Sequence, residues 1–387
     1  MIYYGKQSID EADIQAVEEV LRSDFLTQGP AIEKFERSVA AYCGVKYAVA
    51  VTNATSALHI ACLAAGLGKG DIIWTSPITF VASANCGLYC GASVDFVDID
   101  EKTYNMSVNA LEEKLRQAKK ENRLPKIVVP VHLAGQSCDM MRIRELSETY
   151  GFTVLEDASH GVGADYLKTK VGSCAFSDMA VFSFHPVKII TTGEGGMVLT
   201  NDKTLYERLI LYRSHGITRD PAKMTREADG PWYYQQIALG FNYRMTDMQA
   251  ALGYSQMTRL DAFVARRREL AARYDELLKE MPLKTPYVLE GANPSWHLYI
   301  VRVDFNRLTK TKKQVFEEMK AQGVALNLHY IPVHTQPYYK LLGFQLGDFP
   351  ASERFYEEAF TLPLYVGLTD EEQKTVIETL GKVLRVS

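Results

Sequence analysis

The sequence predicts an α/β protein with a mainly parallel, doubly wound sheet in a large domain and a smaller α+β domain at its C-terminal end. Strand-like apolar runs alternate with helical patterns up to about residue 255. This alternation indicates parallel strands, because adjacent parallel strands need a long crossover that is usually a helix. A long helical pattern then leads into more widely spaced strands and helices. We therefore expect a large domain over residues 1–254 and a small domain over 255–387.

The composition is that of an ordinary globular protein. With 387 residues, 47% of them hydrophobic and 23% charged, the chain can bury two cores and does not belong to the disordered classes. The net charge of −4 gives no reason to expect nucleic acid or a membrane as a partner. We expect neither a membrane span nor a signal peptide. The six cysteines form no CxxC pair, so we expect a cytoplasmic protein without a metal site.

Helix start signals mark elements at both ends of the chain. The run Ser8-Ile9-Asp10-Glu11 predicts a capping box that opens the first helix. Gly29 and Pro30 punctuate a loop, and Pro30 suits the first turn of the helix that follows. Thr369, followed by an acidic run, predicts the cap of the last helix.

A strand-like run over residues 47–52 leads directly into a helical pattern. Asn53, Thr55 and Ser56 then stand at the amino end of that helix, where free N–H groups and the helix dipole favour an anion. A simple N-cap by Asn53 is the alternative.

Two later strand-like runs each end in polar side chains. Glu156, Asp157, Ser159 and His160 follow the first run, and Ser183, His185 and Lys188 follow the second. Ligands of open α/β sheets bind at the carboxyl ends of strands, so we expect the two groups to converge.

A carboxylate and a lysine are therefore expected in one pocket. Apolar neighbours would lower the pKa of Lys188 and favour the neutral amine that forms Schiff bases. Asp157 would then suit the ring nitrogen of pyridoxal phosphate. Taken singly, a solvated lysine and a helix-capping aspartate are the alternatives.

The segments VLEDASH and FSFHPVKIITTGEGGMV resemble those of the DegT/DnrJ/EryC1/StrS sugar aminotransferases, which have fold type I of the aspartate-aminotransferase superfamily. The resemblance extends from YYGKQSID through LTQGP and SPITFVASAN to HYIPVH. It implies that the large domain binds pyridoxal phosphate. It also implies Lys188 as the catalytic Schiff-base residue and Asp157 as the partner of the pyridine nitrogen.

Further cofactor contacts are implied only by this resemblance. Phe80 and His160 match positions packed on the pyridoxal ring, although Phe80 could equally be a core residue. The residues that match phosphate-binding positions of the family are Thr55, Ser56, Ser183 and, from the neighbouring subunit, Asn242. An active site shared by a homodimer follows if Asn242 has this role.

The resemblance also implies a set of residues beside the substrate. These are Tyr4, Asp24, Phe25, Leu26, Thr27, His185, His329 and Tyr330. Ordinary loop packing is the alternative for the first five, and a structural histidine for His185. His329 and Tyr330 fall in an expected strand over residues 324–333, and residues 219–235 are expected to form a mobile loop at the site mouth.

The activity implied is transfer of an amino group from L-glutamate to C4 of a UDP-linked 4-keto-6-deoxy-N-acetylhexosamine, as in pseudaminic acid biosynthesis, with release of 2-oxoglutarate. An aminotransferase for another nucleotide-linked keto sugar is the nearest alternative. A related sugar dehydratase is disfavoured, because those enzymes replace the lysine at position 188 with histidine. A catalytically idle binding or regulatory protein of the same fold would not need Lys188, Asp157 and Ser183 together.

Overall fold

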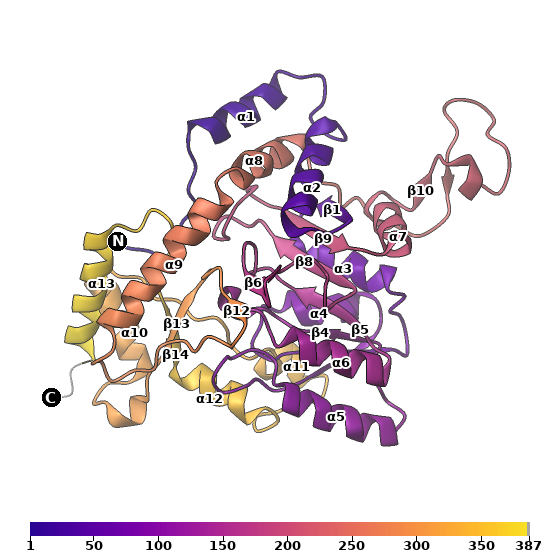
Figure 1. Ribbon diagram of the computed structural model, residues 1–387. Coiled ribbons are helices and arrows are strands. Elements are labelled where there is room, and N and C mark those ends of the chain that lie inside the picture. The colour runs from indigo at the N-terminus through magenta and orange to yellow at the C-terminus, as the bar shows by residue number, and fades with distance from the viewer. Residues whose placement is uncertain (385–387) are drawn as a thin grey trace.

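The computed structural model describes residues 1–384, which form a large α/β body with a smaller unit beside it (Figure 1). A seven-stranded sheet is the centre of the body, with strand order β1-β9-β8-β5-β4-β2-β3. Its strands are β1 (Tyr47–Val51), β2 (Ile72–Thr75), β3 (Ser93–Phe96), β4 (Ile127–Val129), β5 (Thr153–Asp157), β8 (Met179–Ser183) and β9 (Gly196–Thr200). β9 runs antiparallel to both of its neighbours, and the pairs from β8 to β3 are parallel. The predicted mainly parallel sheet is confirmed.

Helices cover both faces of this sheet. They are α2 (Pro30–Cys43), α3 (Ala54–Ala64), α4 (Ala82–Tyr89), α5 (Val108–Lys120), α6 (Met140–Tyr150), α7 (Lys203–Arg213) and α8 (Asp247–Met257). Successive residues of a strand point to opposite faces, so a strand covered on both sides is apolar throughout. In β8, Val181 belongs to the core shared with α3, whereas Phe182 belongs to the core shared with α2.

The C-terminal part of the chain has a hydrophobic core of its own. Its elements are α9 (Leu260–Leu277), β13 (Tyr299–Arg302), α10 (Lys312–Ala321), β14 (Ala359–Leu362) and α13 (Asp370–Val383). Tyr274, Tyr299 and Phe360 are buried at its centre. Between these elements, η4 (Val333–Thr335), α11 (Pro337–Lys340) and α12 (Pro350–Glu358) return to the large sheet, where Val333 and Tyr339 join the α3 core.

The helix caps agree with the sequence in two places and differ in one. Pro30 opens α2, and Thr369 forms a capping box with Glu372 at α13. The first helix, α1 (Glu11–Leu21), is instead capped by Asp10 and Asp13, so the box predicted at Ser8 is wrong. Asp13 is held in place because it is buried beside α8 and accepts a hydrogen bond from Gln256.

The strand expected over residues 324–333 is also absent as a regular element from the described chain. Val324 bridges Ile2, and Asn327 bridges Thr361, as isolated pairs. The N-terminal segment and β14 meet this run at separate points, so no continuous ladder forms. Short pieces elsewhere are β6 (Asp165–Tyr166), β7 (Thr169–Lys170), β12 (Ala292–Asn293), η1 (Leu133–Gly135) and η3 (Phe305–Arg307).

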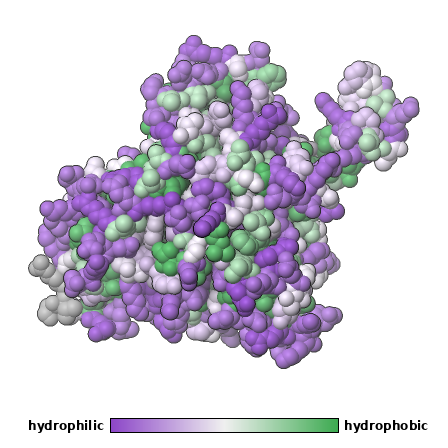
Figure 2. Space-filling view, in the orientation of Figure 1, coloured by the Kyte–Doolittle hydropathy of each residue, from purple (hydrophilic) through white to green (hydrophobic). Residues whose placement is uncertain are grey.

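A two-stranded arm over residues 217–236 stands clear of the body (Figures 1 and 2). It consists of β10 (Ile217–Thr218), η2 (Pro221–Lys223) and β11 (Gln235–Gln236). Gly216 at its root has φ +68°, and a Cβ there would lie 1.8 Å from the Ala238 carbonyl oxygen, so glycine is required. Among the described residues, no helix is long and apolar enough to cross a membrane.

Candidate active site

A cavity of about 560 Å³ lies where β5 and β8 end and α3 begins. Residues of both polar clusters singled out in the sequence line it, because the two strands are parallel neighbours. The predicted residues that line it are Tyr4, Thr55, Phe80, Asp157, His160, Ser183, His185, Lys188, His329 and Tyr330. The volume falls in the range typical of small-molecule sites.

The other predicted site residues of this chain lie outside the cavity lining. Ser56 is buried in the first turn of α3, and its N–H donates to the Asn53 side chain. Asp24, Phe25, Leu26 and Thr27 are exposed in the loop after α1, and Asn242 is exposed before α8. Thr27 pairs with Thr246, which places that loop near Asn242 in space.

Lys188 lies in the turn that follows β8. The turn is closed by the Lys188 N–H, which donates to the His185 carbonyl at 2.9 Å, and is anchored by the buried side chains of Ile189 and Ile190. Burial lowers the pKa of Lys188 to about 8, although the negative charge of Asp157 opposes this shift. A useful fraction of the amine is therefore neutral and nucleophilic near neutral pH.

Asp157 is held by two hydrogen bonds at the end of β5. Ser83 Oγ donates to its Oδ2 at 2.6 Å, and the Ser159 N–H donates to its Oδ1 at 3.1 Å. Ser83 Oγ is itself 2.6 Å from Thr79 Oγ1, and Thr79 lies just before α4. These contacts fix the orientation of a buried carboxylate near the lysine.

The amino end of α3 forms a different wall of the cavity. Asn53 caps the helix, because its side chain accepts a hydrogen bond from the Ser56 N–H. The N–H groups that precede Ser56 in the first turn have no intrahelical partners. β9 approaches this end closely, since a Cβ on Gly196 would lie 2.5 Å from the Asn53 carbonyl carbon. The backbone packing therefore supplies a rigid anion-binding helix end beside Thr55 and Ser183.

Three cavity histidines are uncharged at neutral pH. Burial and the neighbouring Lys188 hold the pKa of His160 well below its ordinary value, and they lower the pKa of His329 to about 3. Burial and His160 hold the pKa of His297 well below its usual range. The Ala134 N–H donates to His160 Nδ1, and His329 Nδ1 lies 2.8 Å from Thr361 Oγ1.

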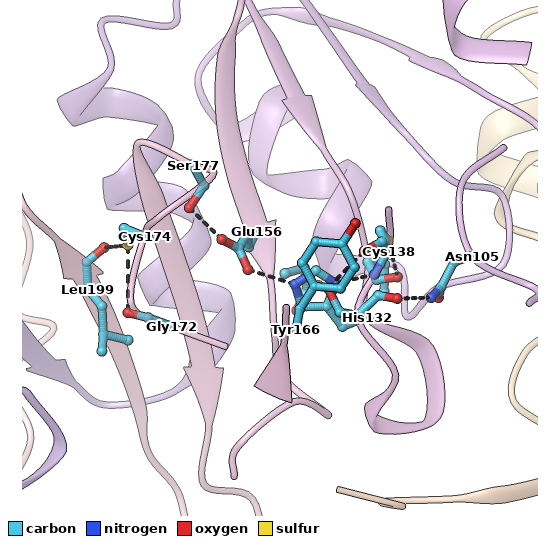
Figure 3. Close-up of polar contacts among 12 residues, drawn as sticks. Asn105, His132, Cys138, Glu156, Tyr166, Gly172, Cys174, Ser177 and Leu199 are labelled. Atoms are coloured by element: carbon cyan, nitrogen blue, oxygen red, sulfur yellow. Dashed lines mark hydrogen bonds and ion pairs between the residues drawn. The ribbon is translucent and has the colours of Figure 1, made fainter. Parts of the chain in front are cut away.

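A buried polar network surrounds Glu156, the residue before Asp157 in β5 (Figure 3). Glu156 points to the opposite side of β5, where its carboxylate lies 2.7 Å from His132 Nε2 and accepts from Ser177 Oγ. The Cys138 N–H donates to His132 Nδ1. Because the His132 N–H also donates to the Asp157 carbonyl, this network fixes the strand end that carries Asp157.

Sequence reasoning missed several residues of the site. They are Thr79, Ser83, Glu194, His297 and Asn327. Thr79 and Ser83 are four residues apart, but Thr79 precedes α4, so helical periodicity gave no indication of their contact. His297 carries no such indication either, because it reaches the cavity only through the packing of the C-terminal part onto the sheet.

The donor set fits pyridoxal phosphate. A lysine with a lowered pKa, a fixed carboxylate and an open helix end match the aldehyde, the ring nitrogen and the phosphate of that cofactor. Phe80, which is 58% exposed at the cavity wall, offers an aromatic face to a ring. Among the described residues, no cluster of metal-ligating side chains is found.

Comparisons with known proteins agree with this assignment. The model of the DegT/DnrJ/EryC1/StrS aminotransferase family matches residues 7–381. The spore coat polysaccharide biosynthesis protein SpsC of Bacillus subtilis is 38% identical over 99% of this chain and 97% of its own. UDP-4-amino-4,6-dideoxy-N-acetyl-beta-L-altrosamine transaminase of Campylobacter jejuni is 36% identical over 99% and 98%. The structure of Helicobacter pylori PseC, an aminotransferase of pseudaminic acid biosynthesis, is similar with a TM-score of 0.90 and 32% identity over 99% of both chains.

Proposed function

Because the chain belongs to the DegT/DnrJ/EryC1/StrS family and is a pyridoxal-phosphate-dependent sugar aminotransferase, we propose that it transfers the amino group of L-glutamate to a UDP-linked 4-keto sugar. The proposed acceptor is UDP-2-acetamido-2,6-dideoxy-β-L-arabino-hex-4-ulose, aminated at C4. The products are then UDP-4-amino-4,6-dideoxy-N-acetyl-β-L-altrosamine and 2-oxoglutarate. The similarity to the Campylobacter jejuni transaminase supports this choice of sugar.

One observation supports the proposal of a pyridoxal-phosphate-dependent amino transfer. Lys188, Asp157 and the amino end of α3 line a single cavity, and the pKa of the lysine is lowered to about 8. When bound there, pyridoxal phosphate supplies an electron sink for the carbanion formed at the amino-bearing carbon. A protein that only bound ligands would gain nothing from a lysine with a lowered pKa beside a fixed carboxylate.

The side chains of the cavity have distinct roles in the proposed reaction. The neutral amine of Lys188 takes the proton from the α-carbon of glutamate and later delivers a proton to C4 of the sugar. Asp157, oriented by Ser83 and Ser159, stabilises a positive charge at the ring nitrogen of the cofactor. Thr55, Ser183 and the α3 N–H groups hold the phosphate, and Phe80 and His160 flank the ring.

We also propose that two copies of the chain share each site. Asn242 and the loop of residues 24–27 are exposed and outside the cavity of their own chain. The arm beside them exposes Trp232 at 72%, and Leu239 after it is exposed at 79%. A second copy would cover these apolar side chains and bring Asn242 to the phosphate of its neighbour.

A different nucleotide-linked keto sugar is the second candidate. The identity to the Bacillus subtilis spore coat protein is as high as that to the altrosamine transaminase, so identity alone does not select the sugar. His185, Tyr4 and Asn327 line the cavity and are the side chains at which sugars would be discriminated.

The reaction is tested by following the visible absorption of the loaded enzyme. We expect glutamate to bleach the cofactor band and the proposed keto sugar alone among candidate UDP- and GDP-linked keto sugars to restore it. Lys188→Ala should abolish both changes. Bleaching without restoration by this sugar would refute the acceptor, and a band insensitive to glutamate would refute the donor.

The shared site is tested by mixing two inactive variants. Lys188→Ala removes the amine, and Asn242→Asp places a negative charge beside the proposed phosphate. If each site takes Lys188 from one chain and Asn242 from the other, a mixed dimer regains one intact site, and random mixing yields about one quarter of wild-type activity. No recovery after exchange of subunits would refute the shared site.

A further inference from the structure

The ring of His160 has one proton, and its position is set by the backbone. The Ala134 N–H donates to His160 Nδ1 at 3.2 Å. An amide nitrogen can only donate, so Nδ1 presents its lone pair and the proton of the neutral ring is on Nε2. Burial and Lys188 hold the pKa of His160 well below its ordinary value, which keeps the ring neutral.

The second hydrogen bond of His160 then has a fixed direction. Nε2 lies 3.1 Å from the hydroxyl oxygen of Tyr330. Since Nε2 carries the proton, it donates, and the Tyr330 oxygen accepts. The hydroxyl proton of Tyr330 must therefore point away from His160, and Tyr330 lines the cavity.

We propose that Ala134, His160 and Tyr330 form a one-way hydrogen-bond relay that makes the Tyr330 hydroxyl a dedicated donor to an anionic oxygen of a substrate. The relay rests on the proposed function, because the substrates it serves are those of the aminotransferase. The oxygen belongs to the carboxylate of the amino donor or to a phosphate of the nucleotide sugar.

The charges of the cavity explain why such a donor is needed. Among the described residues that line it, Lys188 is the one lysine or arginine, whereas Asp157 and Glu194 are carboxylates. His160, His297 and His329 are neutral. Apart from Lys188, the side chains that this chain offers to an anionic oxygen in the cavity are therefore neutral hydrogen-bond donors. Burial and Asp157 raise the pKa of Tyr330, so its hydroxyl keeps the proton that it donates.

The start of the relay is rigid. Ala134 has φ 61°, an unusual conformation for a residue with a side chain. The Leu133 N–H before it donates to Asn105 at 3.0 Å, and the Leu298 N–H donates to the Ala134 carbonyl. Ser295 Oγ donates to the His160 carbonyl. The donor direction of Tyr330 is thus imposed by the fixed backbone that holds His160.

The relay is tested with variants that remove or restore its hydrogen bonds. Tyr330→Phe removes the final donor. His160→Leu removes both bonds, whereas in His160→Gln the amide oxygen accepts from Ala134 and the NH₂ group donates to Tyr330. Tyr274→Phe is the matched control, because it removes a buried hydroxyl that donates to the Pro363 carbonyl outside the cavity.

The two half-reactions are measured separately, with glutamate and with the keto sugar. Tyr330→Phe should raise the KM for one substrate by about ten- to a hundredfold, the loss of one hydrogen bond to a charged group. His160→Leu should give the same increase for the same substrate, and His160→Gln should recover most of it. Tyr274→Phe should leave both KM values near those of the wild type. Equal KM values in Tyr330→Phe and wild type for both substrates would refute the relay.

A measurement independent of activity completes the test. In ¹⁵N spectra of histidine-labelled protein, His160 should be the neutral Nε2–H tautomer from about pH 6 to pH 8, as its two hydrogen bonds require. A proton on Nδ1, or a charged ring, would refute the relay even if the aminotransferase reaction is confirmed. The predicted tautomer in an enzyme that accepts neither substrate would instead refute the proposed function and leave the relay geometry intact.

Discussion

Ser83→Ala should weaken cofactor binding by a predictable amount. Ser83 Oγ donates to Asp157 Oδ2 at 2.6 Å, and both side chains are buried. A hydrogen bond to a charged group contributes about 1.5–3 kcal/mol. Without it, the carboxylate is held only by the Ser159 N–H and can turn away from the ring nitrogen of the cofactor. We therefore expect the dissociation constant for pyridoxal phosphate to rise by about ten- to a hundredfold.

The chain contains a closely matched control for this variant. Ser352 is also buried and donates to Asp98 Oδ1 at 2.6 Å, but neither residue lines the cavity. Ser352→Ala should lower the free energy of unfolding by about as much as Ser83→Ala, that is, about 1.5–3 kcal/mol. Titration of each apoenzyme with pyridoxal phosphate, followed by fluorescence, separates the two effects. Equal dissociation constants in both variants would refute the role of Ser83 in orienting Asp157.

Three further predictions follow from the same cavity. Capture of pyridoxal phosphate by the apoenzyme should accelerate as pH rises through about 8, where Lys188 loses its proton; stopped-flow rates with a midpoint near 10.5 would contradict this. Gly196→Ala should lower cofactor affinity and reduce the free energy of unfolding by about 1–3 kcal/mol, because the new Cβ meets the backbone at the start of α3. In the control Gly68→Ala the new Cβ meets nothing within 4 Å, so cofactor affinity and stability should both stay unchanged. The folded-state pKa of His329 is about 3 and its unfolded value is about 6.5, so its stabilising contribution is complete above 6.5 and is lost as pH falls towards 3. Urea denaturation of His329→Asn should therefore show a shallower loss of stability over that range.

The sequence predicted those parts of the site that depend on strand ends. Asp157 and Lys188 follow apolar runs in β5 and β8, and parallel neighbours must bring such positions together. Ser83 was not predicted as a site residue, because its contact with Asp157 depends on how α4 packs against α3, β2 and β3. His297 reaches the cavity from the C-terminal part of the chain, a contact between segments far apart in sequence that local patterns do not encode.

The capping box shows the same limit on a smaller scale. The sequence predicted a capping box at Ser8, whereas the box forms between Asp10 and Asp13, and Asp13 is buried against α8. A local motif therefore predicted that a helix begins there, while a tertiary contact with Gln256 selected the residue that caps it. Tertiary contacts also determine the structure of residues 324–333, which form no continuous strand because separate segments pair with them at separate points.

The predicted site residues that do not line the cavity, residues 24–27 and Asn242, lie together on the surface. Thr27 pairs with Thr246 and Asn242 pairs with Ser214, so the loop of residues 24–27 and the segment before α8 lie side by side. Arg244 lines a cleft of about 270 Å³ at the same place, together with Glu33, Glu36 and Arg213, and Arg213 is paired with Glu36 at 2.6 Å. This surface therefore adds the cation of Arg244, whereas Lys188 is the one lysine or arginine among the described residues that line the cavity. The proposed nucleotide sugar carries two phosphates, and the proposed donor carries two carboxylates. In the proposed shared site, this surface of one chain would face the cavity of the other and add the charge of Arg244 to that of Lys188.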